Sequence, residues 1–247
     1  MGPIINNRQQ TANNVSYCEP RDAWIEVTDK QQFFYFNIRG RGELIRLILH
    51  AAEKDFVDQR VTSAEWTNLK PKIPFKKLPV LEVATPNGDT VMLTESMAIA
   101  RLLARSFNLY GNDAGEIYLI ERFNSLPLDN DRPSVRDDVD ISSLLEGIYS
   151  SNLKDADNYA KIANAEQIYE YFDAIETALR ERKGTFVAGN RVTIADLQII
   201  VLIDTIDRFL SKFKHDCVGK LHEIKESVLR QKPGVAKYLR SRPVTDF

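Results

Sequence analysis

Cysteine and histidine are scarce in this sequence. Its 247 residues include two cysteines, Cys18 and Cys217, which give no CxxC pair, no zinc cluster and no disulfide framework. The three histidines do not form a metal-binding pattern either. His50 falls in an apolar stretch that predicts a helix, and we expect His215 and His222, in a polar, lysine-rich stretch, to be solvated. We therefore expect no metal, and any catalysis must depend on another group or on a bound cofactor.

Neither sign of charge is in excess, and long apolar runs are missing. The chain has 33 basic and 35 acidic side chains and a net charge of -2, so neither nucleic acid nor an acidic membrane surface is an expected partner. The longest apolar stretch, Leu197–Ile203, is too short to span a bilayer. The first thirty residues show no apolar core of a signal peptide. We therefore expect a cytoplasmic protein.

The first part of the chain alternates strands with a helix. Residues 1–31 are polar and aperiodic, and we expect them to form a flexible extension. The aromatic run Phe33–Phe36 predicts a buried strand, and an amphipathic helix follows over 44–51. Apolar residues within 56–61 predict a second strand. This order of elements is a βαβ unit.

A second group of elements completes this domain. The lysine- and proline-rich stretch 63–78 is expected to be a long loop with about one helical turn. Pro79–Val83 predicts a strand that begins on its proline, where the missing N–H is tolerated. Asn87-Gly88 predicts a hairpin turn into a returning strand, and Glu95-Ser96 opens a helix. The order βαβ and then ββα predicts an α/β, thioredoxin-like domain over residues 32–108.

The remainder of the chain, 113–247, predicts an all-α domain. Thr193 and Asp196 have the spacing of a capping box, which predicts where a buried helix begins. The helix that follows is apolar almost all round and is therefore expected to be central. The stretch 125–142, with two prolines, gives no helix prediction. Helical periodicity predicts the other helices at 113–124, 159–181, 218–231 and 234–241.

A thioredoxin-like domain joined to a helical domain, without a CxxC motif, resembles the plan of the soluble glutathione transferases. The likeness is to the sigma class and especially to its flatworm members. It covers about 33–247 and fails near 125–157. The motifs that carry it occur in the order of that class: Tyr35–Arg41, Glu65-Trp66, Lys70-Pro71, Leu78–Leu81, Glu95–Arg101, Ala188–Asp196 and Tyr238–Pro243.

The resemblance implies a site that activates glutathione, which would be a co-substrate. Tyr35 would donate a hydrogen bond to the thiol sulfur and favour the thiolate, and Arg41 would support that tyrosine. Taken from its own strand alone, Tyr35 is one more buried aromatic, so the surrounding motifs carry the assignment. Leu78-Pro79 would hold a cis peptide bond, so that the Leu78 backbone pairs with the cysteinyl part of glutathione.

Other residues would bind the two ends of the tripeptide. Glu95 and Ser96, at a helix N-terminus, would bind the ammonium and the carboxylate of the γ-glutamyl group. Serine at such a position is also a common ordinary cap. Trp66 and Lys70 would hold the glycyl end, and Lys77 would contribute only its backbone.

The resemblance also implies a homodimer. Asp129 aligns with an acidic residue that reaches glutathione bound to the neighbouring subunit. Pro127 stands two residues earlier, where the family has a continuous helix, and an interior proline costs about 3 kcal/mol or more. This helix would line the pocket for the second substrate, so we expect that wall to be kinked or rebuilt.

Three functions are compatible with these residues. The leading one is the conjugation of glutathione to small hydrophobic electrophiles, which is a detoxification reaction. The second is glutathione-dependent prostaglandin D isomerisation, and no residue separates it from the first. The third is a non-catalytic crystallin-like protein or ligand carrier. The retention of Tyr35, Trp66, Lys70 and Ser96 favours glutathione binding over this third function.

Overall fold

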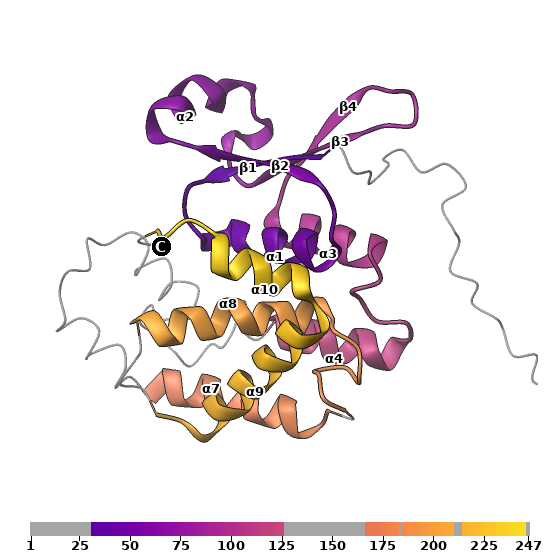
Figure 1. Cartoon of the computed structure of the whole chain (residues 1–247), viewed down its shortest axis with the longest axis vertical. Coiled ribbons are helices and arrows are strands. Elements are labelled where there is room, and N and C mark those ends of the chain that lie inside the picture. Colours follow the sequence, from indigo (N-terminus) through magenta and orange to yellow (C-terminus); the bar gives the residue numbers. More distant parts are fainter. Residues whose placement is uncertain (1–30, 126–165, 183, 210–213, 246–247) are drawn as a thin grey trace, which may run out of the picture.

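The computed structural model describes residues 31–125, 166–182, 184–209 and 214–245, which form a small sheet-containing part and a larger helical part (Figure 1). Three of the predictions fall elsewhere. Residues 1–30 of the predicted extension, Asp129 and nearly all of the stretch 125–157 lie outside the described residues. Gln31, which was predicted to end the extension, is buried and begins the first strand instead.

Four strands form one sheet in the order β2-β1-β3-β4. The central strand β1 (Gln31–Phe36) pairs in parallel with β2 (Phe56–Val61) and antiparallel with β3 (Val80–Ala84). The strand β4 (Thr90–Leu93) pairs antiparallel with β3. Alternate residues of β1 are buried, because one face of the sheet packs on helices. The four predicted strands are confirmed, except that β3 begins at Val80 and not on Pro79.

Two helices lie between the sheet and the helical part of the molecule. These are α1 (Glu43–Ala51) and α3 (Ser96–Ser106), and both run beneath the sheet in Figure 1. Helix α1 is buried along almost its whole length, and it packs against α3, α8 and α10. The fold class predicted from the sequence, a thioredoxin-like domain followed by a helical one, is confirmed.

The prediction of a long loop over 63–78 was wrong. Helix α2 (Ser63–Leu69) begins there, and two short 3-10 turns, Lys70–Lys72 and Pro74–Lys76, follow it. The helix starts with a capping box: Glu65 N–H donates to the Thr62 hydroxyl at 3.2 Å, and Thr62 N–H donates to the Glu65 carboxylate at 2.8 Å. These two bonds satisfy donors that the first turn of a helix leaves unpaired.

The helical part is built around α8 (Ile194–Phe209), which lies in the middle of the bundle in Figure 1. It packs against α1, α4 and α9, so its predicted central position is confirmed. The helices around it are α4 (Ala114–Ser125), α7 (Glu166–Arg180), α9 (Asp216–Gln231) and α10 (Pro233–Ser241).

The predicted capping residues do mark the start of α8. The fully buried Asp196 carboxylate accepts hydrogen bonds from Thr193 N–H at 2.8 Å, from the Thr193 hydroxyl at 2.8 Å and from Val187 N–H at 2.9 Å. Burial raises the pKa of Asp196 to about 6, even though these donors favour the ionised form. Asp196 thus fixes both the helix start and the loop before it.

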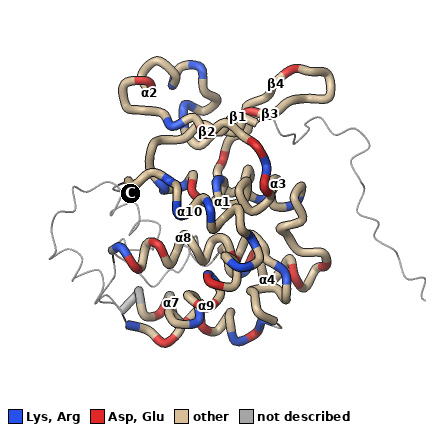
Figure 2. Tube along the Cα trace, viewed as in Figure 1, with Lys and Arg blue, Asp and Glu red and all other residues tan. Residues whose placement is uncertain are grey.

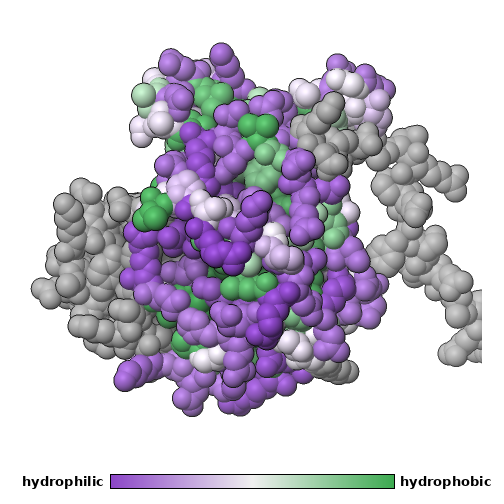
Figure 3. Space-filling model, viewed as in Figure 1, coloured by the Kyte–Doolittle hydropathy of each residue, from purple (hydrophilic) through white to green (hydrophobic). Residues whose placement is uncertain are grey.

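The surface of the described residues is mostly polar. On the face drawn in Figure 3, hydrophilic side chains predominate and hydrophobic ones gather in small separate patches. The side chain of Phe75, in the second 3-10 turn, is an exception, since 78% of it is exposed. Among the described helices, none combines the length and the hydropathy needed to cross a bilayer.

Candidate active site

Strand register brings three of the predicted motifs to one edge of the sheet. Phe34 lies opposite Val80, so one further step places Tyr35 opposite Pro79. Leu81 lies opposite Leu93, which ends β4 just before Glu95. The end of β1, the start of β3 and the end of β4 therefore meet at the same edge, because β3 runs antiparallel to both neighbours.

The start of α2 lies at this edge too. Phe36 pairs with Val61, the last residue of β2, and α2 begins two residues later. The Phe36 ring packs 5.8 Å from the ring of Tyr35 and 5.7 Å, edge-on, from that of Trp66. Lys70 follows one helical turn after Trp66, and its N–H donates to the Trp66 carbonyl. The rings of Tyr35, Phe36 and Trp66 thus pack in a row, and Lys70 is linked to Trp66 by its backbone hydrogen bond.

Tyr35 has the environment of a hydrogen-bond donor. Its ring is 6% exposed, and its hydroxyl oxygen accepts the N–H of Arg41 at 3.1 Å. The phenolic hydrogen can therefore point toward a ligand. Burial raises the pKa of Tyr35, although the Arg41 N–H and the charges of Arg41 and Arg46 lower it in part. The phenol is consequently protonated at neutral pH and can donate its hydrogen.

The turn after β1 fits closely around the Tyr35 hydroxyl. Gly40 has φ 36°, a conformation that residues with a side chain rarely adopt. A Cβ atom at Gly40 would lie 2.7 Å from the Tyr35 hydroxyl oxygen. Arg41, which we expected to support the tyrosine, contacts it through its backbone N–H, and its supporting role stays a prediction.

Arg46 is a residue of the site that the sequence prediction missed. It is fully buried on α1, and its guanidinium lies 5.7 Å from the centre of the Tyr35 ring. Its Nε lies 3.1 Å from both carboxylate oxygens of Asp58, and its Nη1 donates to the carbonyl of Ile38 at 2.8 Å. The signal was present in the sequence as a basic residue among the apolar residues of a predicted helix.

The peptide bond between Leu78 and Pro79 is cis, as predicted. Pro79 is buried and Leu78 is half-buried, directly before β3. The Leu78 backbone therefore lies at the same edge as Tyr35.

Glu95 and Ser96 lie at the start of α3. Ser96 is the first helical residue, so it is not the N-cap; that position belongs to Glu95, whose side chain makes no capping bond. The first N–H groups of α3 thus lack an acceptor within the helix and can bind an anion. Glu95 is exposed and has φ 67° and ψ 105°. Such strained backbone is concentrated at functional sites.

Positive charge collects in the two 3-10 turns that follow α2, as the blue segments there show in Figure 2. Lys70 and Lys77 are exposed there, as are Lys72 and Lys76. The electrostatic field at this end of the site suits a carboxylate. Asp129 lies outside the described residues, so its predicted role stays a prediction.

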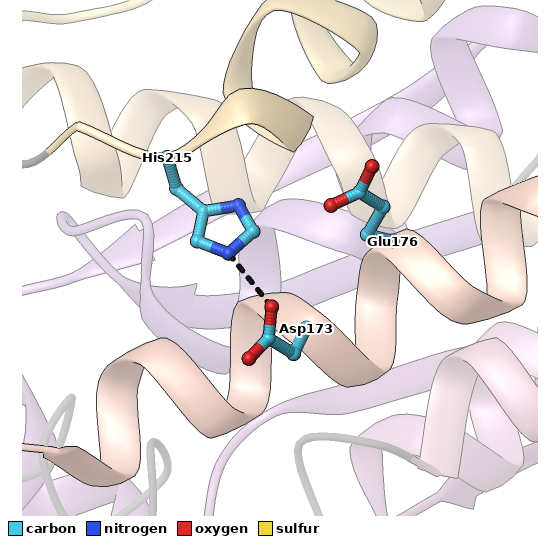
Figure 4. A group of neighbouring side chains, drawn as sticks. All are labelled: Asp173, Glu176 and His215. Carbon is cyan, nitrogen blue, oxygen red and sulfur yellow. Dashed lines mark hydrogen bonds and ion pairs between the residues drawn. The ribbon is translucent and has the colours of Figure 1, made fainter.

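A polar cluster between α7 and α9 corrects the expectation for His215 (Figure 4). The His215 side chain is only 10% exposed, and atoms of Asp173, Glu176 and His215 lie within 4.8 Å of one another. Nδ1 of His215 accepts the Cys217 N–H at 3.2 Å, which places the proton of the neutral ring on Nε2, 3.2 Å from Asp173. Lys220 pairs with Glu176 at 2.7 Å. This bonding describes a helix cap with ion pairs better than a metal site.

A thioredoxin-like domain with a tyrosine at its active edge, followed by a helical domain, is the architecture of the soluble glutathione transferases. The family described as "Glutathione S-transferase, N-terminal domain" matches residues 31–105, and "Glutathione S-transferase, C-terminal domain" matches residues 139–242. The chain therefore belongs to the glutathione S-transferase family of enzymes, which use glutathione as a co-substrate.

Individual relatives agree with this assignment. The chain is 31% identical to the glutathione S-transferase class-mu 28 kDa isozyme of Schistosoma japonicum, over 87% of this chain and all of the relative. It is similar to the solved sigma class transferase of Fasciola hepatica, with 30% identity, a TM-score of 0.77 and coverage of 88% and 99%. The prostaglandin synthase D of Nilaparvata lugens, at 23% identity, a TM-score of 0.67 and coverage of 87% and 100%, shares the fold.

Proposed function

We propose that this protein is a sigma-class transferase in which the Tyr35 hydroxyl ionises the thiol of glutathione for attack on small hydrophobic electrophiles. The observation that carries the proposal is the buried, protonated hydroxyl of Tyr35, which accepts a backbone N–H and keeps its own hydrogen for a ligand. The glutathione thiol has a pKa of about 8.5 in water, and its thiolate is the reactive form.

The size of the effect required is modest. A hydrogen bond to a charged group contributes about 1.5–3 kcal/mol, which equals roughly one to two pKa units. One such bond from Tyr35 lowers the thiol pKa to about 7, so that close to half of the bound glutathione is ionised at neutral pH. The Arg41 N–H polarises the phenol and strengthens its donation.

We propose that the other motifs orient the tripeptide. The N–H groups at the start of α3 and the Glu95 carboxylate face the γ-glutamyl end, and the Leu78 backbone pairs with the cysteinyl part. Trp66 and Lys70 hold the glycyl carboxylate, with backbone help from Lys77. These assignments are supported by the shared edge of the sheet, by the strained Glu95 backbone and by the exposed lysines that follow α2.

The proposal extends to the setting of the enzyme. We propose a homodimer in which Asp129 reaches the partner's glutathione, in line with the family resemblance. We propose a detoxifying role in the cytosol, where glutathione is kept reduced. The two cysteines of the chain, which form no disulfide framework, are consistent with that compartment.

The test compares the chain with its Tyr35→Phe variant, using glutathione and a chlorodinitrobenzene acceptor. We expect conjugation that falls at least tenfold in the variant, which corresponds to about 1.4 kcal/mol of lost transition-state stabilisation. An unchanged rate in Tyr35→Phe would contradict the mechanism. Isomerisation of a prostaglandin endoperoxide without consumption of glutathione would identify the isomerase alternative, and tight glutathione binding without turnover would identify a carrier.

A further inference from the structure

The chain reaches back from its last helix to the turn that supports Tyr35. Arg242 follows α10, and its guanidinium contacts two carboxylates, that of Glu43 at the start of α1 and that of Asp204 on α8. Arg242 and Glu43 are 199 residues apart in the sequence. The helical part of the molecule thus binds the first turn of α1 directly.

Glu43 depends on these distant donors. It is 1% exposed, and its carboxylate accepts a hydrogen bond from the Tyr238 hydroxyl at 2.9 Å as well as from Arg242. The guanidinium of Arg46 lies farther away, at 3.8 Å. A buried carboxylate is stable only where it is paired and hydrogen-bonded. The position of Glu43 is therefore set by Tyr238 and Arg242.

Arg242 is fixed on its other side by the core of the bundle. Asp204, its second carboxylate, also pairs with Lys225 of α9 at 3.0 Å. The side chains of Arg242 and Asp204 are 12% and 11% exposed. Because guanidinium is planar and carries several donors in fixed directions, it can bridge two carboxylates at once. A lysine has a compact ammonium group without this planar set of donors and would reproduce the bridge only in part.

The turn before α1 transmits the position of Glu43 to Tyr35. Glu43 N–H donates to the Gly40 carbonyl, and Gly42 N–H donates to the Arg39 carbonyl at 3.2 Å. Between them, the Arg41 N–H donates to the Tyr35 hydroxyl. A shift of Glu43 therefore moves the donor that polarises the phenol.

We propose that Arg242 is a positioning residue, which acts through Glu43 to hold the Arg41 N–H against the Tyr35 hydroxyl and so promotes ionisation of the bound thiol. This inference rests on the proposed function of Tyr35. It predicts a change in the ionisation of glutathione and little change in its binding, because Arg242 lies behind the turn and not at the edge of the sheet.

The test compares Arg242→Gln with Arg240→Gln, which alters an exposed arginine on α10. The pH profile of conjugation to the chlorodinitrobenzene acceptor and the ultraviolet absorption of bound thiolate are measured for each. For Arg242→Gln we expect a rate about three- to tenfold lower near neutral pH, a normal rate at alkaline pH and a glutathione KM within about twofold. Arg240→Gln should match the wild type. Adding Arg242→Gln to Tyr35→Phe should cause no further loss.

The remaining outcomes separate failure of the proposal from failure of a variant to fold. A rate that falls equally at every pH, or a further loss in the Tyr35→Phe background, would show that Arg242 acts on overall stability alone. If Arg242→Gln does not fold, Arg242→Lys carries the test: a smaller shift in the same direction supports the proposal and no shift overturns it. If Tyr35→Phe is as active as the wild type, the proposed function fails as well, a result distinct from failure of Arg242 alone.

Discussion

The substitution Gly40→Ala tests how tightly the turn after β1 constrains Tyr35. Alanine at φ 36° costs about 1–2 kcal/mol in backbone strain. Its Cβ atom would also lie 2.7 Å from the Tyr35 hydroxyl oxygen, well inside normal contact distance, and such overpacking costs about 1–3 kcal/mol. We therefore expect a loss of about 2–5 kcal/mol in the free energy of unfolding, measured by urea denaturation.

The effect of this substitution on catalysis should be larger than its effect on glutathione binding. Moving the hydroxyl by even a fraction of an ångström weakens the Arg41 bond and misplaces the thiol, and a shift of 1 Å costs about a hundredfold in rate. We expect conjugation to fall tenfold or more. Gly219→Ala in helix α9 is the matched control, because a Cβ atom there meets nothing within 4 Å. This variant should keep full activity, and its free energy of unfolding should rise by about 0.5–1 kcal/mol. A Gly40→Ala protein with wild-type stability and rate would refute the steric argument.

Two further predictions concern ion pairs, one of them with a buried arginine and the other partly exposed. Arg46→Met removes the buried partner of Asp58, which keeps its contact with Arg60 at 2.8 Å, and also removes the donor to the Ile38 carbonyl, so it should cost about 1–3 kcal/mol in urea unfolding. Arg180→Met, which removes an exposed arginine, should cost less than about 0.5 kcal/mol, and equal losses would contradict the assigned role of Arg46. The hydrogen bond from Arg101 lowers the pKa of Glu121, so the stabilisation from this partly exposed pair should be present above the unfolded pKa of about 4.3 and disappear as the pH falls through the lower folded value. The unfolding free energies of the wild type and of Glu121→Gln are compared across pH 3–7. The wild type should be more stable by about 1 kcal/mol or less, and this difference should vanish at acid pH. A difference that grows at acid pH would contradict the prediction.

Local sequence patterns predicted most of the fold because their causes are local. Short aromatic and apolar runs with a turn signal predicted the strands, and an almost wholly apolar run after the Thr193 and Asp196 cap predicted the central helix. The same kind of signal was overlooked for α2, where the spacing of Thr62 and Glu65 forms a capping box. The lysines and prolines around 63–78 favoured a loop prediction, but composition is weaker evidence than two defined hydrogen bonds.

The site was less predictable because its energetics depend on partners far away in the sequence. Tyr35 and its neighbours were assigned through the resemblance to the glutathione transferases, yet nothing local to Arg46 showed that its partners would be Asp58 and the carbonyl of Ile38. His215 was predicted to be solvated from its polar neighbours, whereas its ring packs 5.7 Å from that of Phe172 on α7. Contacts of this kind arise from the tertiary arrangement alone.

The contact between Glu43 and Arg242 has a consequence for the order of events during synthesis. Their separation of 199 residues takes the ribosome on the order of 10–40 s to translate, and N-terminal domains generally fold first. The thioredoxin-like part of a nascent chain thus emerges while the buried carboxylate of Glu43 still lacks both Tyr238 and Arg242. The turn that holds the Arg41 N–H against Tyr35 gains these partners only when α10 packs against α1. A chain that ends within its final helix would contain every residue proposed to contact glutathione and would still react slowly. Full activity therefore requires that translation has passed residue 242.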